Sequence, residues 1–238
     1  MNYSHKSDLR PRLSLFLGSF LLLAVVGDSL RAEARHYLPA GEPDSAIFLA
    51  PPPLPGSAEQ AADMAAVVAI CHACTTNEAA LAFGEKKFSM FSFTPAIGEF
   101  LQPGKVPKTE AFFQRLQKDA AAAADAAKDY WKRPRPFTVD PTLASGKLEK
   151  SFGYPSGHST EATVLALVLA DVFPAKREGI MAVGRDIGWH RLWIARHYPT
   201  DIYAGRVLAQ AIVREMKSNP DFQRDFAEAK SEIAAAQL

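Results

Sequence analysis

Residues 108–132 read KTEAFFQRLQKDAAAAADAAKDYWK, and this stretch indicates the fold class most directly. Its alanine-rich centre, residues 120–127, favours helix because alanine has the highest helix propensity. Pro134 and Pro136 follow at once, and proline cannot continue the hydrogen-bond ladder of a helix. The sequence therefore predicts one long helix over residues 108–132.

Similar helical signals recur on both sides of this stretch. Residues 57–70, SAEQAADMAAVVAI, place alanine and valine three and four positions apart, and Ser57 followed by Gln60 is typical of a helix N-terminus. Segments that alternate with the period of a strand are scarce. We therefore expect an all-α fold, a single-domain bundle of six or more helices. The other expected helices cover residues 159–173, 176–195, 199–217 and 220–237.

The composition is that of an ordinary globular protein, with 48% hydrophobic and 22% charged residues in a chain of 238. The formal net charge is +1, and a general nucleic-acid binder would show a basic surplus, so no nucleic-acid partner is expected. Two cysteines exclude a disulfide scaffold and a four-cysteine zinc module.

The N-terminal residues have the pattern of an export signal. A basic start is followed by an apolar run over residues 13–27 and by the small residues Ala32 and Ala34. This order predicts a secretory signal peptide over residues 1–34, cleaved before Arg35, and hence a periplasmic or secreted protein. The apolar run has 15 residues, whereas a transmembrane helix needs about 20, so no stable membrane insertion is expected after cleavage. A retained membrane anchor is the alternative.

Two more segments complete the expected organisation. Residues 35–56 are rich in proline and are expected to form an extended arm, which would suit contact with a neighbouring subunit, although the oligomeric state is left open. Residues 57–238 are expected to form the helical domain. Within it, Cys71 and Cys74 would form a local disulfide in an oxidising compartment. Residues three apart on a regular helix are too distant for that bond, so it would require a helix end or a distortion near Cys71.

Two stretches place polar residues at expected helix ends. Residues 128–136 read KDYWKRPRP, and basic residues in such a place are usually solvated when they occur alone. Residues 154–160 read YPSGHST and precede an apolar helical stretch. Ser156 is an expected helix cap, whereas Gly157 allows a ligand to approach the backbone and a helix N-terminus offers free N–H groups to an anion. The second stretch is therefore a candidate cradle for a phosphate or an oxyanion.

A third stretch, residues 191–201, reads RLWIARHYPTD. Pro199 suits the first position of a helix, so His197 is expected just before that helix and Asp201 in its first turn. The carboxylate would accept a hydrogen bond from one imidazole nitrogen and leave the other lone pair free to attack, as the acid does in catalytic triads. A helix-capping aspartate beside an unrelated histidine is the alternative.

Together the three stretches match the pattern K-x6-R-P … P-S-G-H … R-x5-H-x3-D in order and in spacing. This pattern resembles the phosphatidic-acid-phosphatase type 2 superfamily, which includes the vanadium haloperoxidases. Within that superfamily the chain is similar to the class A bacterial non-specific acid phosphatases over roughly residues 50–215. The resemblance implies a secreted helical acid phosphatase that acts on small phosphomonoesters, nucleotides among them, without a metal ion or another cofactor.

The resemblance also implies a role for each fixed position. His197 would attack phosphorus in line and form a phosphohistidine, while Asp201 holds its imidazole. His158 would protonate the leaving alkoxide and later take a proton from the incoming water. The positions expected to bind the phosphate are Lys128, Arg135, Ser156, Gly157 and Arg191. Phosphoryl transfer requires mainly positioning and charge stabilisation around the oxygens, which such a set would supply.

One position departs from the family pattern, since His190 stands where the family usually has serine. We expect this change to affect the pH profile or the substrate preference rather than the reaction itself.

Other functions fit the same sequence less well. A serine hydrolase would need glycines where Tyr154 and His158 stand. A metal hydrolase would need clustered carboxylates and histidines without the cations that repel a metal ion. A vanadate-dependent haloperoxidase and a non-catalytic phosphate-binding protein stay as alternatives, and transfer of the phosphoryl group to a second alcohol would accompany hydrolysis.

Overall fold

The computed structural model describes residues 36–237, and every regular element within that range is helical, which confirms the predicted all-α class. The α-helices in this range are α1 (Ser45–Phe48), α2 (Ala58–Ala73), α3 (Thr76–Gly84), α4 (Thr94–Ile97), α5 (Pro107–Trp131), α6 (Pro136–Val139), α7 (Gly157–Val172), α8 (Arg177–Trp193), α9 (Pro199–Lys217) and α10 (Pro220–Ala236). Short 3-10 turns lie at Met90–Phe93, Pro141–Leu143 and Pro174–Lys176.

The six helices predicted from the sequence are all present, and their ends agree to within about three residues. The caps explain this agreement. Ser57 accepts a hydrogen bond from the N–H of Gln60 at the start of α2, and Pro199 is the first residue of α9. The short helices α1, α3, α4 and α6 were not predicted.

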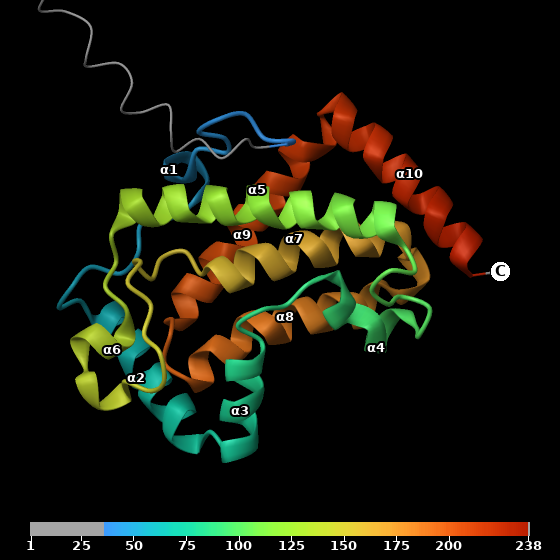
Figure 1. Ribbon diagram of the computed structural model, residues 1–238. Coiled ribbons are helices and arrows are strands. Elements are labelled where there is room, and N and C mark those ends of the chain that lie inside the picture. The colour runs from blue at the N-terminus through green and yellow to red at the C-terminus, as the bar shows by residue number, and fades with distance from the viewer. Residues whose placement is uncertain (1–35, 238) are drawn as a thin grey trace, which may run out of the picture. The chain divides into compact units, whose positions relative to one another are not determined.

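Helix α7 is the centre of the bundle, and it packs against α5, α8 and α9. In Figure 1 it lies between α5 and α8. Most of its side chains are buried, including Val164, Leu165, Val168 and Leu169. A helix that is apolar on all sides must be covered on all sides, so α7 occupies the core and its N-terminal end lies among its neighbours.

Three glycines let the neighbouring helices approach α7 closely. A Cβ atom on Gly205 of α9 would lie 2.7 Å from the carbonyl oxygen of Ser156. On α8, a Cβ on Gly184 would lie 2.7 Å from that of Ala166, and a Cβ on Gly188 would lie 3.1 Å from that of Ser159. Two of these three contacts lie in the first turn of α7 or at its cap, so the tight packing fixes this helix end.

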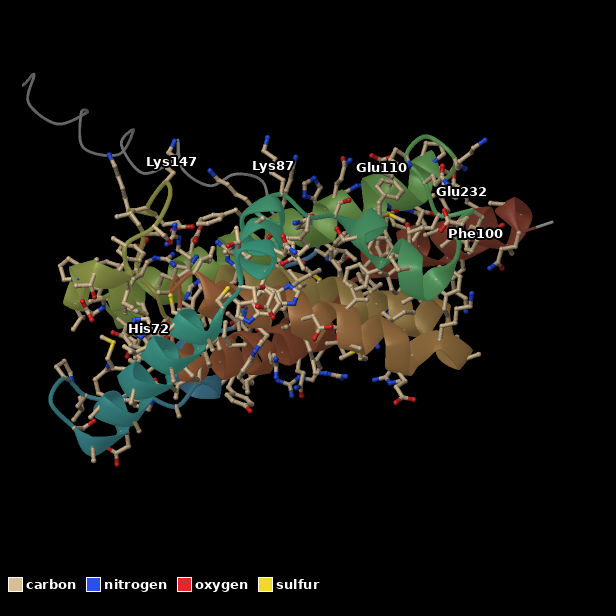
Figure 2. The ribbon with its side chains drawn as sticks, turned by 90° about the horizontal axis from the view of Figure 1, so that it is seen from below. His72, Lys87, Phe100, Glu110, Lys147 and Glu232 are labelled. Carbon is tan, nitrogen blue, oxygen red and sulfur yellow. The ribbon has the colours of Figure 1, made fainter. Side chains whose placement is uncertain are left out.

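Both ends of α5 are also fixed. Glu232 of α10 accepts hydrogen bonds from the N–H groups of Lys108 and Thr109 at 3.1 and 2.7 Å. Figure 2 shows Glu232 close to Glu110, which lies in the same first turn of α5. At the other end Lys132 adopts a left-handed conformation with φ of 50°, which stops the helix. The chain therefore leaves α5 in a defined direction just before Arg133 and Arg135.

A second, smaller cluster of buried residues lies beneath α2, α6 and the start of α9. It contains Val67, Phe137, Leu143, Leu192 and Ile202, among others. Within residues 36–237 no helix is by itself long and apolar enough to cross a membrane. The pair α2 and α3 reaches that length and composition only jointly, across a bend of 110°.

The proline-rich segment differs from the extended arm that the sequence predicts. Tyr37, Leu38 and Leu49 are buried in the main core, and α1 interrupts the segment. The carboxylate of Asp119 on α5 accepts hydrogen bonds from the N–H groups of His36, Tyr37 and Leu38, at 2.7 to 3.2 Å. The segment from residue 36 is therefore packed against its own chain. The predicted signal peptide, residues 1–34, lies outside the described residues.

The predicted disulfide is not formed in this structure. Cys71 lies in the last turn of α2 and Cys74 is its C-cap, and both are free cysteines. The helix end that the disulfide would require is present, because Cys74 has an extended backbone with φ of −67° and ψ of 128°. Its thiol instead donates to the carbonyl of Thr75 at 3.4 Å.

Candidate active site

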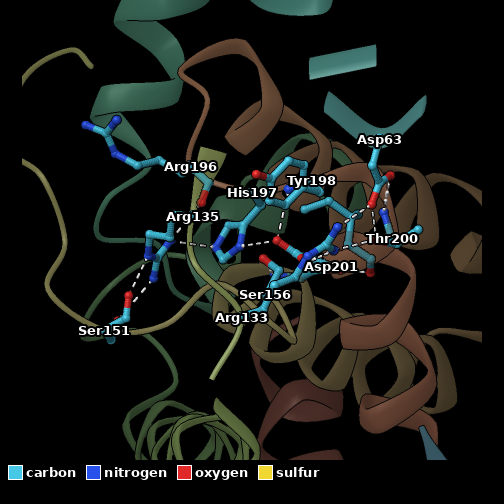
Figure 3. Close-up of polar contacts among 12 residues, drawn as sticks. Asp63, Arg133, Arg135, Ser151, Ser156, Arg196, His197, Tyr198, Thr200 and Asp201 are labelled. Carbon is cyan, nitrogen blue, oxygen red and sulfur yellow. Dashed lines mark hydrogen bonds and ion pairs between the residues drawn. The ribbon is translucent and has the colours of Figure 1, made fainter. Parts of the chain in front are cut away.

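The three stretches that match the family pattern come together at the N-terminal end of α7. Lys128 lies in the last turn of α5, and Arg135 lies at the start of α6. His197 lies in the connection between α8 and α9, and the N–H of Ser156 donates to the carbonyl of Asp201 at 3.0 Å. Residues far apart in the sequence therefore surround one helix end (Figure 3).

His197 is buried, and its two ring nitrogens have different partners. Nδ1 lies 3.4 Å from Oδ2 of Asp201, and Nε2 lies 3.2 Å from Nη1 of Arg135 (Figure 3). A guanidinium can only donate hydrogen bonds, so the contact with Arg135 requires the lone pair on Nε2. The proton of the neutral ring is then on Nδ1, on the side of Asp201.

The surroundings of His197 favour its neutral form. Burial lowers the pKa of His197 well below 6.5, and Arg135, Lys128 and Arg191 lower it further by charge repulsion. A hydrogen bond to the carbonyl of Gly153 acts in the opposite direction. An imidazole that stays neutral keeps a lone pair on Nε2, which is what a nucleophile requires.

His158 lies in the first turn of α7 and has one nitrogen without a partner. A hydrogen bond to the backbone carbonyl of Glu85 holds the ring, while Nε2 is buried without a hydrogen-bond partner within residues 36–237. Phe88 packs against the ring with a centroid separation of 5.5 Å. Burial lowers the pKa of His158 well below 6.5, and Arg191, His197 and Lys128 lower it further. The free Nε2 can exchange a proton with a bound group.

Each of the three predicted cations is held by a group outside the site. Arg135 donates from Nε to the carbonyl of Ser151 at 2.7 Å. Lys128 pairs with Asp125 at 2.7 Å. A Cβ on Gly157 would lie 3.1 Å from Nζ of Lys128, so the ammonium lies beside the start of α7 and the glycine leaves room for it.

Arg191 is buried and is fixed at one edge of its guanidinium. Nη1 donates to the carbonyl of Ala82 at 2.7 Å, and Nη2 lies 3.5 Å from the carboxylate of Glu149. Its Nε is buried without a hydrogen-bond partner in the described part of the chain. Burial lowers the pKa of Arg191 to about 10, a value that still leaves it charged near neutral pH.

The N-terminus of α7 adds backbone donors to these cations. Ser156 is its N-cap, and the serine hydroxyl accepts from the N–H of Ser159 at 3.3 Å. The N–H groups of Gly157 and His158 in the first turn have no intrahelical acceptor. Free N–H groups and the positive end of the helix dipole favour an anion at this point.

Several residues that shape the site were missed in the sequence. Arg133 donates to Asp201 and ion-pairs with Asp63 of α2. Its side chain is only 4% exposed, whereas the sequence pattern of this stretch, taken alone, predicts solvated basic residues. The sequence signal for this contact is the charged Asp63 among the apolar residues of α2, since a buried carboxylate requires a partner.

Arg196, also missed, is 1% exposed and forms an ion pair with Glu149 at 2.7 Å. Glu149 thus lies between Arg191 and Arg196. The C-terminal end of α3 was missed as well, although its Ala82 and Glu85 carbonyls contact two site residues. Backbone carbonyls carry no side-chain signature, so no motif could have revealed this contact.

His190, the departure from the family pattern, points to the same end of α3. Its Nδ1 lies 2.9 Å from the carboxylate of Glu85, and its ring stacks on Trp193 at 4.0 Å.

Among residues 36–237 there is no group of three or more histidine, cysteine, aspartate or glutamate side chains arranged to hold a metal ion.

Comparison with known families identifies this region. Residues 120–223 match the model of the PAP2 superfamily, and this range contains all three motifs. Asp63 of α2, Ala82 of α3 and Glu85, the C-cap of α3, precede the matched range.

Curated proteins that this chain resembles carry related names. A non-specific acid phosphatase of Providencia stuartii is 31% identical over 149 residues, and one of Salmonella typhi is 32% identical over 147. These alignments cover 60% and 59% of each chain, so this chain matches about three fifths of their length. An acid phosphatase of Zymomonas mobilis is 28% identical over 233 residues, 92% of this chain and 88% of that protein.

One solved structure has a similar fold. The transmembrane PAP2-type phosphatidylglycerolphosphate phosphatase of Bacillus subtilis matches with a TM-score of 0.50 and 20% sequence identity. The match covers 73% of this chain and 89% of that chain. At this level of identity the likeness concerns the fold alone.

Proposed function

We propose that this protein is an acid phosphatase that hydrolyses small phosphomonoesters through a phosphohistidine on His197. The observation that carries the proposal is the orientation of His197: Nδ1 faces Asp201, and Nε2 presents its lone pair among Lys128, Arg135 and Arg191. The names of the curated relatives support the same activity.

In the first step, Nε2 of His197 attacks phosphorus opposite the ester oxygen. The N–P bond forms while the P–O bond to the leaving alkoxide breaks. Nδ1–H stays hydrogen-bonded to Asp201, which stabilises the positive charge that develops on the imidazole. Arg135, which contacts Nε2 in the free enzyme, turns its N–H toward the phosphate oxygens once substrate is bound.

His158 then acts on the two oxygens that leave and arrive. Its Nε2–H protonates the leaving alkoxide, and the neutral Nε2 afterwards takes a proton from the water that attacks phosphohistidine. The P–N bond breaks, and phosphate is released. The unpartnered Nε2 next to Arg191 and Lys128 supports this role. An alcohol in place of water would give phosphoryl transfer.

The charge stabilisation in this proposal comes from the protein itself. Three cations and the N-terminus of α7 surround the phosphate, which is the arrangement that phosphoryl transfer requires. The same cations would repel a divalent metal ion, so we propose a reaction that needs none. Export to the periplasm or the medium is proposed from the pattern of residues 1–34 alone.

The test is hydrolysis of a chromogenic phosphomonoester by the purified protein, in EDTA, with and without vanadate. We expect activity to persist in EDTA and to be lost with vanadate, which mimics the five-coordinate phosphorus. Loss of activity in EDTA would contradict the metal-free mechanism. Binding of phosphate without turnover would indicate a binding protein, and oxidation of bromide by peroxide with vanadate would indicate a haloperoxidase.

A further inference from the structure

Arg133 makes a set of contacts that the three motifs do not explain. Its side chain, in the turn between α5 and α6, is buried. At one edge of the guanidinium, Nη1 donates to Oδ1 of Asp201 and to the hydroxyl of Thr200, both at 2.6 Å. At the other, Nη2 donates to Asp63 and to Gln60, both at 2.7 Å. Figure 3 shows this network beside the imidazole of His197.

The two oxygens of Asp201 have separate partners. Oδ1 bonds Arg133, whereas Oδ2 accepts from the N–H of Tyr198 at 2.9 Å and faces Nδ1 of His197 at 3.4 Å. A carboxylate is planar, so a strong contact to Oδ1 also determines where the lone pairs of Oδ2 point. The hydrogen bond to the imidazole therefore depends on the position of Arg133.

Arg133 is itself held from several directions. Asp63 of α2 is buried and forms an ion pair with it, and the hydroxyl of Thr200 bonds the same carboxylate of Asp63. The ring of Tyr198 lies 4.0 Å from the centre of the guanidinium. The contacts run in sequence from Asp63 through Arg133 and Asp201 to His197, and so join α2 to the nucleophile.

We propose that Arg133 is a positioning residue, which together with Asp63 keeps Asp201 ionised and directs its Oδ2 to Nδ1 of His197. The N–H groups of its two terminal nitrogens are bonded to Asp201, Thr200, Asp63 and Gln60, and Nε is buried without a partner in the described residues. Its role is therefore exerted on the acid and not on the phosphate. The kinetic consequences of this role rest on the proposed function, whereas the state of the His197 ring does not.

The charges around Asp201 determine the expected pH dependence. The titratable or charged groups that act on it are Arg133, Arg135, Tyr154, His197 and Tyr198, and Asp63 pairs with Arg133. Burial raises the pKa of Asp201, and Arg133 opposes this effect more than any other group. Removal of Arg133 should therefore raise the pKa of Asp201 further. A protonated Asp201 no longer stabilises the imidazolium, so the acidic limb of the rate profile should move to higher pH.

Three variants test the proposal by steady-state kinetics across pH. Arg133→Gln should lower kcat by about 10- to 100-fold, by analogy with the loss of a hydrogen-bonding partner behind a metal-bound histidine, and leave KM within about twofold. Its acidic limb should move up by roughly one pH unit. Arg133→Lys keeps the positive charge but loses the planar set of donors, so the acidic limb of its rate profile should move less than that of Arg133→Gln. Asp63→Asn should give a smaller change in the same direction.

Arg115→Gln is the matched control. Arg115 is a partly buried arginine that pairs with Asp225 on α10, outside the site. Its variant should lose thermal stability and keep the pH profile of the wild type. If the Arg133 variants lost activity only in proportion to their folded fraction, or if KM rose while kcat stayed constant, the positioning role would be wrong.

Nitrogen-15 NMR of the imidazoles supplies a readout independent of turnover, with the signals of His197 assigned by comparison with His197→Ala. We expect protonated Nδ1 and unprotonated Nε2 in the wild type, and a changed tautomer ratio and titration in Arg133→Gln. Arg133→Lys and Asp63→Asn serve the same measurement if Arg133→Gln does not fold. Unchanged His197 signals in all three variants would overturn the proposal. An inactive wild type whose His197 signals still change in the Arg133 variants would instead contradict the proposed function and support the positioning role.

Discussion

The guanidinium of Arg191 is hydrogen-bonded through Nη1 but has another donor without a protein partner in the described residues. Nη1 is bonded to the carbonyl of Ala82, whereas Nε is buried without a partner in the described residues. We expect Arg191→Ala to lower kcat/KM by about 10²- to 10³-fold, because it removes charge stabilisation that grows in the transition state. Arg191→Lys should recover only part of the loss, since an ammonium lacks the bidentate geometry. A fully active lysine variant, measured by steady-state kinetics, would contradict the role of the guanidinium.

In the proposed mechanism His158 and His197 have opposite protonation requirements, which gives a prediction about leaving groups. His158 must carry a proton to act as an acid, yet burial and three neighbouring cationic or histidine groups lower its pKa well below 6.5. Activity toward alkyl phosphates should therefore be highest at acidic pH and fall as the pH rises. His158→Ala should lower kcat/KM for an alkyl phosphate by about 10²- to 10⁴-fold and spare nitrophenyl phosphate, whose leaving group needs no proton.

The same variant isolates the two chemical steps. Because His158 is also the proposed base for the second step, His158→Ala should accumulate phosphohistidine from nitrophenyl phosphate. Rapid quench with a phosphorus-32 substrate and alkaline work-up would detect it. Label retained on His197→Ala protein, or a loss in His158→Ala that is equal for both leaving groups, would contradict the assigned roles.

Glu161, one turn beyond Gly157, predicts a pH-dependent stability. Burial raises its pKa from 4.5 to about 7, against a hydrogen bond from Gln117 and the charge of Lys128. The folded state therefore binds more protons than the unfolded state between these values, and the protein loses stability as pH rises through this window. Glu161→Gln stays neutral, so relative to the wild type it should gain on the order of 2 kcal/mol between pH 4.5 and pH 8. Urea unfolding of both proteins at pH 4.5 and at pH 8 measures this gain. If the two proteins differed in free energy of unfolding by the same amount at both pH values, the prediction would be wrong.

At the scale of elements, the sequence contains the signals for the helices and their ends but not for how they meet. Ser57 and Pro199 mark helix starts that need only local chemistry. Helix α3 also has a local signal, since Thr75 and Glu78 form a capping box at its start. The contact of its C-terminal carbonyls with Arg191 and His158 depends on tertiary packing, and no residue type encodes it.

Gly205 and Gly179 give a matched test of helix packing. A Cβ on Gly205 would meet the carbonyl oxygen of Ser156 at 2.7 Å, so Gly205→Ala should destabilise the fold by about 1 to 3 kcal/mol and displace the start of α7. In Gly179→Ala the Cβ would lie 3.5 Å from Ala96, an ordinary contact, and the variant should gain about 0.5 to 1 kcal/mol. Thermal unfolding compares the two variants, and a change of stability in the same direction in both would contradict the packing argument.

At the scale of the molecule, the site gathers its groups from nearly the whole described chain. The motifs could be predicted because they are local patterns with fixed spacing, and the structure places all of them at one helix end. The contacts of Arg133 with Asp63 and of Arg196 with Glu149 could not, since each pair is buried by helices that meet only in the folded state.

Asp119 links the N-terminal segment to α5 and tests the packing of that segment. Its carboxylate accepts from three successive N–H groups, and it is buried. Asp119→Ala leaves those donors unsatisfied and should lower the free energy of unfolding by about 2 to 4 kcal/mol. Asp129→Ala, at an exposed position of the same helix, should change it by less than about 0.5 kcal/mol. Denaturant unfolding measures both, and an equally small effect of Asp119→Ala would show that the segment contributes little.

The support that α2 and α3 give to the site has a consequence for modularity. A fragment cut to residues 120–223 would keep every residue of the three motifs. It would lose Asp63, which anchors Arg133, and the Ala82 and Glu85 carbonyls, which hold Arg191 and His158. The reactive groups would then remain without the framework that aims them. A design that places this candidate site in another protein therefore requires α2 and α3 as well as the three motifs.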